Sequence, residues 1–117
     1  MITGLHHFAI LASSETSVDF YKKLGFRETY RKERKYDTVV LLDGYRMQIE
    51  MFVDLNHPKR ATNPENMGLR HLALKVESIE DTVKELGIEI GPIMNDWGGV
   101  RFAFTADPDG LPIELHE

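Results

Sequence analysis

Apolar and polar residues alternate in the same order in both halves of the chain. A short alternating segment opens each half, at residues 5–10 and 69–74, and predicts a strand with one buried face. Each half also closes with an alternating segment that follows a turn signal. In the first half the turn signal Asp43-Gly44 precedes residues 47–51. In the second half the stronger turn signal Asp107-Pro108-Asp109-Gly110 precedes residues 112–115.

A helix is predicted after the opening strand of each half. Residues 17–26 and 79–88 carry apolar positions at helical spacing. Capping residues stand in matching places: Ser14 and Ser78 as N-caps, Gly25 and Gly87 as left-handed C-caps.

The repeated order predicts an α+β fold in which strand, helix and three strands occur twice. We expect one domain over residues 1–117, made of a first module (1–54), a connecting loop (55–67) and a second module (68–117). The loop is rich in proline and asparagine. Each helix is expected to pack on one side of a curved sheet and to leave a cavity on the other.

Composition narrows the function. The net charge of −5 and the lack of a basic run argue against nucleic acid as a partner. No segment is long and apolar enough to span a membrane, and no secretory signal is visible, so a cytoplasmic location is expected. The chain has no cysteine, so a metal site must be built from histidine and carboxylate side chains.

Two histidines and two glutamates repeat at one spacing. His7 and His71 are 64 residues apart (71 − 7), as are Glu50 and Glu114 (114 − 50). Each histidine is third in a Leu-x-His-x-Ala segment, and each glutamate follows an isoleucine in the closing strand. A pseudo-twofold axis between the halves would bring all four toward one centre. Strand alternation places Gln48 and Phe52 on the same face as Glu50; both are candidate substrate contacts.

Two imidazoles and two carboxylates suit one divalent ion: nickel, cobalt, zinc, manganese or iron. A bound substrate oxygen would be polarised there, and Glu50 or Glu114 would move a proton as base and then acid. Taken singly, a strand histidine is more often structural and a strand glutamate is usually solvated. The repetition of the pair favours the metal site.

Four segments resemble the vicinal oxygen chelate superfamily, which includes glyoxalase I, bleomycin resistance proteins and dioxygenases. The resemblance covers essentially the whole chain and is most specific in its second half. The segments are residues 5–10, 20–26, 68–74 and 107–115.

The resemblance implies two βαβββ modules that form a barrel-like cup, commonly completed by a homodimer. It puts the family's metal ligands at His7, Glu50, His71 and Glu114. This set is closer to glyoxalase I, a lyase that isomerises the hemithioacetal of methylglyoxal and glutathione, than to the extradiol dioxygenases. The alternatives are an epimerase, a dioxygenase, an antibiotic-modifying transferase, or a binding module without catalysis for a small molecule.

Two positions depart from the glutathione-dependent bacterial enzymes of this family. Leu11 stands where they carry an arginine, and Asp54 where they carry an asparagine. Both family residues contact the glutathione end of the substrate. The departures leave the superfamily in place and put glutathione in doubt.

Further candidates have a structural alternative each. Lys75 is expected on the cavity side of its strand, as a substrate contact or a solvated lysine. Arg101 is a candidate for a substrate contact or an ion pair, and Trp97, before Gly98-Gly99, for a substrate cover or a buried ring. Three further expectations concern other side chains: Phe102 and Phe104 lie in the core, His6 faces away from His7, and His116 frays at the C-terminal end.

Overall fold

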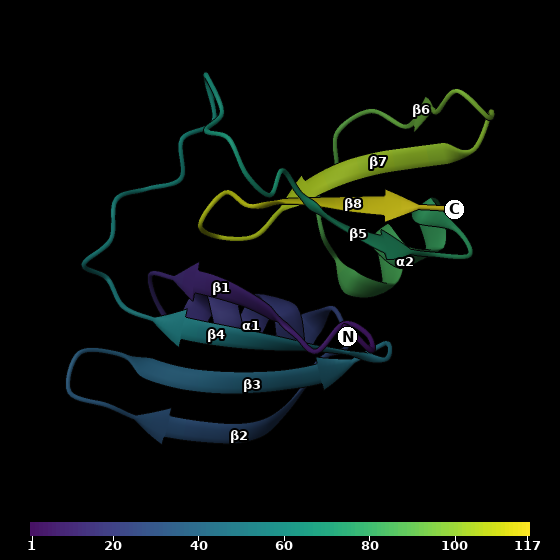
Figure 1. The fold of residues 1–117 in the computed structure, drawn as a ribbon. Helices are drawn as coiled ribbons and strands as arrows, with labels where there is room; N and C mark the ends of the chain where they lie inside the picture. The colour runs from purple at the N-terminus through teal and green to yellow at the C-terminus, as the bar shows by residue number, and fades with distance from the viewer. The chain divides into compact units, whose positions relative to one another are not determined.

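The computed structural model describes all residues 1–117 and divides them into two compact units, Met1–Pro58 and Lys59–Glu117. Figure 1 shows the same order of elements in each unit. Unit 1 contains β1 (Phe8–Ala12), α1 (Glu15–Lys23), β2 (Arg27–Glu33), β3 (Thr38–Gly44) and β4 (Met47–Val53). Unit 2 contains β5 (Leu72–Lys75), α2 (Ile79–Leu86), β6 (Met94–Asn95), β7 (Arg101–Ala106) and β8 (Pro112–His116). The predicted α+β class with two βαβββ modules is confirmed.

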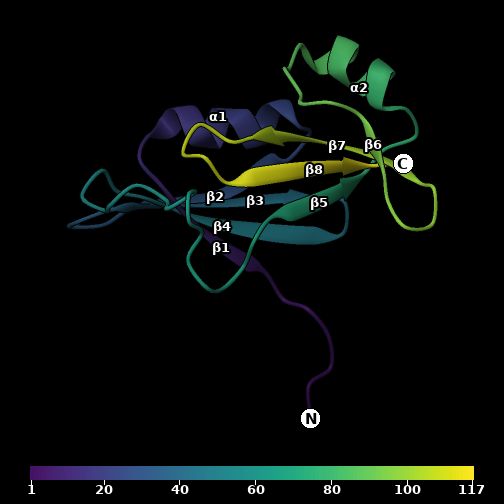
Figure 2. The same cartoon turned by 90° about the horizontal axis from the view of Figure 1, so that it is seen from above.

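The two sheets have equivalent topologies. Unit 1 has the strand order β1-β4-β3-β2 and unit 2 the order β5-β8-β7-β6. In each sheet the first and last strands of the unit lie side by side and parallel, and the other neighbours are antiparallel. Figures 1 and 2 show each helix against one face of its own sheet. The opening and closing strands of each unit are therefore adjacent.

The cores lie between helix and sheet. In unit 1 the apolar side chains with no exposed surface come from α1 and from alternate positions of β3 and β4: Val18, Tyr21, Val40, Leu42, Ile49 and Met51. In unit 2 Ile79, Ala103 and Leu115 form one buried cluster, with Val83 of α2 packed against it, and Ile113 of β8 is also fully buried. Burial of one face leaves the opposite face of each sheet for other contacts; we call it the open face.

The helix caps follow the sequence closely. The Ser14 and Ser78 hydroxyls accept hydrogen bonds from backbone N–H groups at the start of α1 and α2. Gly87 is the predicted left-handed cap of α2. In α1 the cap is Leu24 in a right-handed conformation, and Gly25 follows it at a φ of +112°.

The turn between β3 and β4 differs from the prediction. Asp43-Gly44 was expected to form it, but Gly44 ends β3, and the two turn residues are Tyr45 and Arg46, with φ of 54° and 63°. This is the backbone of a type I′ hairpin, which matches the twist of its strands. Gly44 is required for a different reason: a Cβ there would lie 2.8 Å from Cδ1 of the buried Phe26.

The second predicted turn has the expected form. Asp107 is buried, and its Oδ1 accepts hydrogen bonds from the backbone N–H of Asp109 at 2.9 Å and of Leu111 at 3.0 Å. Gly110 has a φ of +90° and donates to the Asp107 carbonyl at 3.0 Å. This turn sets the chain direction into β8. The predicted connecting loop, 55–67, holds only an isolated bridge between Thr62 and Glu65.

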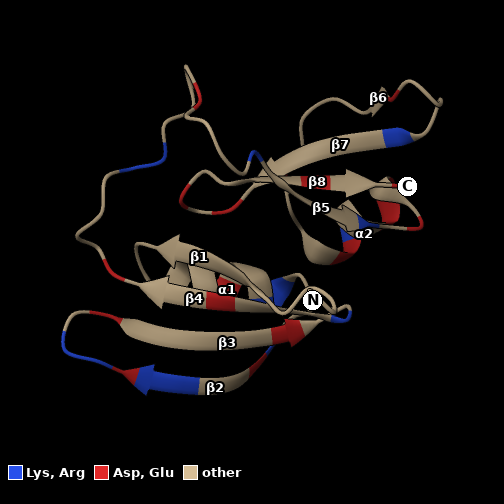
Figure 3. Cartoon of the chain, in the orientation of Figure 1, with Lys and Arg blue, Asp and Glu red and all other residues tan.

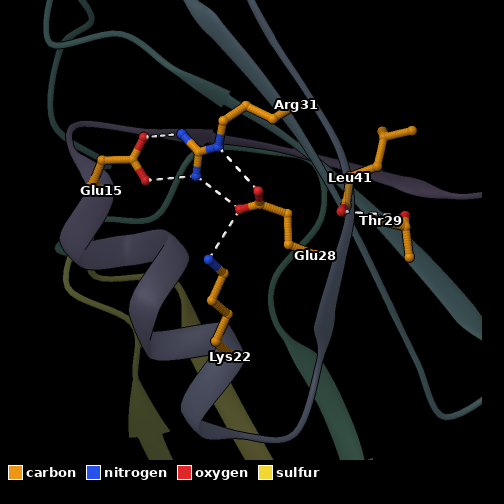
Figure 4. A network of polar contacts seen from close by, with 6 residues as sticks. All are labelled: Glu15, Lys22, Glu28, Thr29, Arg31 and Leu41. Atoms are coloured by element: carbon orange, nitrogen blue, oxygen red, sulfur yellow. Dashed lines mark hydrogen bonds and ion pairs between the residues drawn. The ribbon is translucent and has the colours of Figure 1, made fainter.

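Charged side chains connect α1 to β2 on the surface of unit 1. Figure 4 shows Arg31 between the carboxylates of Glu15 and Glu28, with Lys22 on the far side of Glu28. The hydrogen bonds from Arg31 and Lys22 lower the pKa of Glu28 to about 2. The network holds β2, an outer strand, beside the helix.

No helix in the protein has the length and apolar character needed to cross a membrane.

Candidate functional site

The two predicted histidine–glutamate pairs occupy equivalent places in the two sheets. In the parallel pair β1–β4, Ala9 lies opposite Glu50. In the parallel pair β5–β8, Ala73 lies opposite Glu114. Each histidine stands two residues before its alanine, so the repeated spacing in sequence becomes a repeated register in three dimensions.

Both glutamates lie on the open faces. Their neighbours along the strand, Ile49 and Met51 in β4 and Ile113 and Leu115 in β8, are fully buried toward the helix. Alternation then turns Glu50 and Glu114 to the other side, where both are half-buried. Each is the only charged residue of its strand, which Figure 3 shows as a single red band on β4 and on β8. The predicted placement of Glu50 with Gln48 and Phe52 agrees with this alternation.

The histidines lie one residue outside the strands. Both were predicted within a strand, but β1 begins at Phe8 and β5 at Leu72. The prediction that His6 faces away from His7 is wrong for the same reason: alternation does not apply before the strand begins. The two Nδ1 atoms are 2.8 Å apart. Nδ1 of His7 takes part in this contact, whereas its Nε2 does not.

In unit 2 the predicted ligands approach each other closely. The His71 Nε2 is 3.8 Å from the Glu114 Oε2, and the His71 ring meets Phe104 edge-on at 5.2 Å between centroids. Phe104 lies opposite Glu114 in the β7–β8 pair. An aromatic ring thus supports the histidine on the face that carries the carboxylate. Neither unit gathers three or more His, Asp or Glu side chains around one point.

The prediction that Phe102 and Phe104 are core residues is wrong. Ala103 is the fully buried residue of β7 and lies opposite Leu115 on the helix side. The two phenylalanines have the opposite parity, are half-buried and lie on the open face. Their rings are 5.9 Å apart, so together they form an apolar surface beside Glu114.

Arg101 lies two residues before Ala103 in β7, so its side chain points to the same face, toward the helix. Its guanidinium forms ion pairs with Glu80 of α2 and, at 3.2 Å, with Glu117. Of the two alternatives for this arginine, the structure shows the ion pair.

Lys75 is exposed at the end of β5 and lies opposite His116. It is two residues after Ala73, so its side chain points to the same face as that of Ala73. This places Lys75 on the open face, as expected.

The remaining predicted contacts of unit 1 already have protein partners. Gln48 donates a hydrogen bond to Asp43 at 2.9 Å. Phe52 lies under the Arg34 guanidinium, 5.4 Å from the ring centroid. Leu11 lies opposite Phe52 and is 55% exposed, so an apolar side chain covers this part of the open face.

The Asp54 side chain contacts groups near itself in sequence, while its backbone N–H donates to the Ala12 carbonyl at 2.8 Å. Its carboxylate accepts a hydrogen bond from the Asn56 N–H at 2.9 Å and lies 3.3 Å from the His57 Nε2. Trp97 is fully exposed in the turn between β6 and β7. The alternative of a buried ring is therefore wrong.

The contact between His116 and Asp96 was not predicted from the sequence. His116 was expected to fray, but it belongs to β8, and its Nε2 is 3.2 Å from the Asp96 Oδ2. The Asp96-Trp97-Gly98 segment carries a signal that was available: an aspartate two residues before a glycine favours a side-chain-to-backbone turn. The partner, twenty residues away, had no local signal.

Two mixed sheets, each flanked by one helix and built on one βαβββ plan, define the class of fold. A profile of the Glyoxalase/Bleomycin resistance protein/Dioxygenase superfamily matches residues 4–115. The chain belongs to this family.

Similar proteins cover the same length. The protein YwkD of Bacillus subtilis (strain 168) is 46% identical over all of this chain and 98% of its own length. A crystal structure of a glyoxalase family protein from Enterococcus faecalis is 40% identical, with a TM-score of 0.89 over 97% of both chains.

Two structures share the fold at lower identity. A lactoylglutathione lyase from Agrobacterium tumefaciens is 17% identical, with a TM-score of 0.70 over 99% of this chain and 94% of that chain. A fosfomycin resistance protein FosX from Listeria monocytogenes, in complex with Mn(II) and dihydroxypropylphosphonic acid, is 21% identical, with a TM-score of 0.74 over 99% and 93%. At these identities the likeness concerns the fold alone.

Proposed function

We propose that the chain is a metal-dependent lyase or isomerase of the glyoxalase I type, with His7, Glu50, His71 and Glu114 holding one divalent cation. The observation that carries this proposal is the equal register of the two pairs, Ala9 with Glu50 and Ala73 with Glu114. A structural role gives no reason for the same donors at the same places in both sheets.

The donor set fits such an ion. Two imidazole nitrogens and two carboxylate oxygens, without sulfur, suit Ni, Co, Zn, Mn or Fe. Ligand atoms bonded to one metal at about 2.1 Å lie roughly 3 to 4 Å apart. The 3.8 Å between His71 Nε2 and Glu114 Oε2 is within this range. The Mn(II) in the FosX complex supports a divalent cation in this fold.

A cation bound by these four residues would polarise a substrate oxygen and acidify the neighbouring C–H bond. The carboxylates of Glu50 and Glu114 are the groups that move the proton, first as a base and then as an acid. Phe102 and Phe104 keep the surface beside Glu114 apolar, which strengthens electrostatic interactions there. Lys75 offers a cation at the end of the same face for an anionic substrate group.

The substrate is a small α-hydroxycarbonyl compound or a thiol adduct. Leu11 and Asp54 favour an adduct other than the glutathione one, because an exposed leucine offers no charge to a carboxylate and Asp54 would repel it. The predicted homodimer and cytoplasmic location form part of this proposal.

The test is turnover of the methylglyoxal–glutathione hemithioacetal with each of the five metals, compared with the adducts of other small thiols. We expect metal-dependent turnover of at least one adduct, and its loss in Glu50→Gln and Glu114→Gln. The matched control Glu85→Gln, on the exposed side of α2, should retain full turnover. Equal activity in all three variants would contradict the assigned roles. Metal binding without turnover of any adduct would favour a binding module.

A further inference from the structure

The turn between β6 and β7 is built around one carboxylate. The Asp96 Oδ1 accepts hydrogen bonds from the backbone N–H of Gly98 at 2.8 Å and of Val100 at 2.9 Å. The Asp96 N–H also donates to the Val100 carbonyl at 2.9 Å, and the Gly99 N–H donates to the Asp96 carbonyl at 3.0 Å. Residues 96–100 are therefore held in one backbone conformation.

The other oxygen of the same carboxylate reaches β8. The Asp96 Oδ2 is 3.2 Å from the His116 Nε2. Backbone hydrogen bonds, chiefly from Val100, lower the pKa of Asp96, so its carboxylate acts as an acceptor. Nε2–H is then the donor.

His116 itself is fixed on the sheet. Its ring stacks on Phe102, with 6.4 Å between centroids and 14° between planes. Its Nδ1 is 3.1 Å from the Glu117 carbonyl oxygen. The ring lies on the open face, two residues along β8 from Glu114. The turn is thus connected to the strand that carries a proposed metal ligand.

This turn presents the only tryptophan of the chain. Trp97 is fully exposed, although the backbone on both sides of it is held by Asp96. An exposed large aromatic side chain on an ordered loop is typical of a contact residue. An ordered backbone reduces the entropy lost when such a residue binds.

We propose that Asp96 and His116 are positioning residues that hold the Trp97 turn rigidly beside the strand of Glu114. Trp97 is then presented in one position as a contact for the substrate. The substrate contact rests on the proposed function, whereas the rigid connection is a property of unit 2 alone. The pair is partly exposed, at 35% for the histidine side chain and 16% for the aspartate, so it adds little to global stability. Its effect is local.

The test uses Trp97 as its own reporter, in metal-free protein. Asp96→Asn keeps Oδ1 as an acceptor for the turn and replaces Oδ2 with an amide that cannot accept from His116. His116→Leu removes the donor, and His116→Gln restores a neutral one. The measurement is time-resolved fluorescence anisotropy, in which local motion of Trp97 appears as a rapidly decaying fraction. We expect this fraction to rise about twofold in Asp96→Asn and His116→Leu. In His116→Gln it should stay near the wild-type value. The thermal midpoint should not change.

The chain offers a matched control in the pair Asp54–His57 of unit 1, which has the same atoms at 3.3 Å. Asp54→Asn and His57→Leu should leave Trp97 depolarisation unchanged. Wild-type Trp97 motion in both Asp96→Asn and His116→Leu would overturn the proposal. So would equal loosening in the control variants. Because no metal is added, either result stands apart from the outcome for the metal site.

Discussion

Replacement of Asp107 by alanine should weaken the turn that leads into β8. The side chain is 4% exposed, and Oδ1 accepts from two backbone N–H groups, those of Asp109 and Leu111. Asp107→Ala leaves both donors without this partner. A buried donor that loses its partner costs about 1–3 kcal/mol, so we expect a loss of about 3 kcal/mol, with water reaching part of the cavity.

Asp107→Asn is the control, because its amide oxygen can still accept both hydrogen bonds. It should lose about 1 kcal/mol. The assay is urea unfolding followed by circular dichroism, together with the thermal midpoint, which should fall by about 10 °C in Asp107→Ala. Stability of Asp107→Ala within about 0.5 kcal/mol of wild type would refute this reasoning. Equal destabilisation by alanine and asparagine would also do so.

Other predictions concern unit 1. Gly44→Ala should destabilise the fold by about 1–2 kcal/mol, because its Cβ would meet Phe26. Gly91→Ala is the control and should not destabilise the fold, because the nearest atom to its Cβ is 3.8 Å away. Equal thermal midpoints for the two variants would count against the packing role of Gly44. Glu28→Gln should cost about 1 kcal/mol at neutral pH. Arg31 lowers the pKa of Glu28 in the folded protein from 4.5 to about 2, so this stabilisation is complete above pH 4.5 and is lost as the pH falls toward 2. A difference between wild type and Glu28→Gln that persists at pH 2 would contradict the ion-pair explanation.

The sequence was sufficient for features that depend on neighbouring residues. Ser14 and Ser78 begin the two helices because their hydroxyls accept from the first backbone N–H groups. The turn at Asp107 forms because its side chain and Gly110 supply the required bonds and backbone angle. The helix-cap signal and the alternating strand segments occur once in each half, so the order of elements followed from the internal repeat.

Features that depend on a neighbouring strand were less predictable. Phe102 and Phe104 look like core residues, but pairing of Ala103 with Leu115 turns them to the open face. Gly44 looks like a turn residue, but it is required because of its close approach to Phe26, and the turn lies two residues later, at Tyr45 and Arg46. Contacts across a sheet leave no periodic signal along one strand.

The same limit applies to the candidate site. The repetition of His7, Glu50, His71 and Glu114 in the sequence predicts one site, and the register of the two sheets is consistent with it. The contact between Asp96 and His116 joins residues that have no repeated counterpart, so only the structure reveals it.

The most direct test of the central claim is the metal content of the purified protein and of single alanine variants. Elemental analysis would be run on wild type, His7→Ala, Glu50→Ala, His71→Ala and Glu114→Ala, with His57→Ala as the matched control. We predict about one divalent ion per site in the wild type and in the His57 variant, and a large loss in each of the other four. Full metal content in those four variants, or none in the wild type after loading with any of the five metals, would contradict the account.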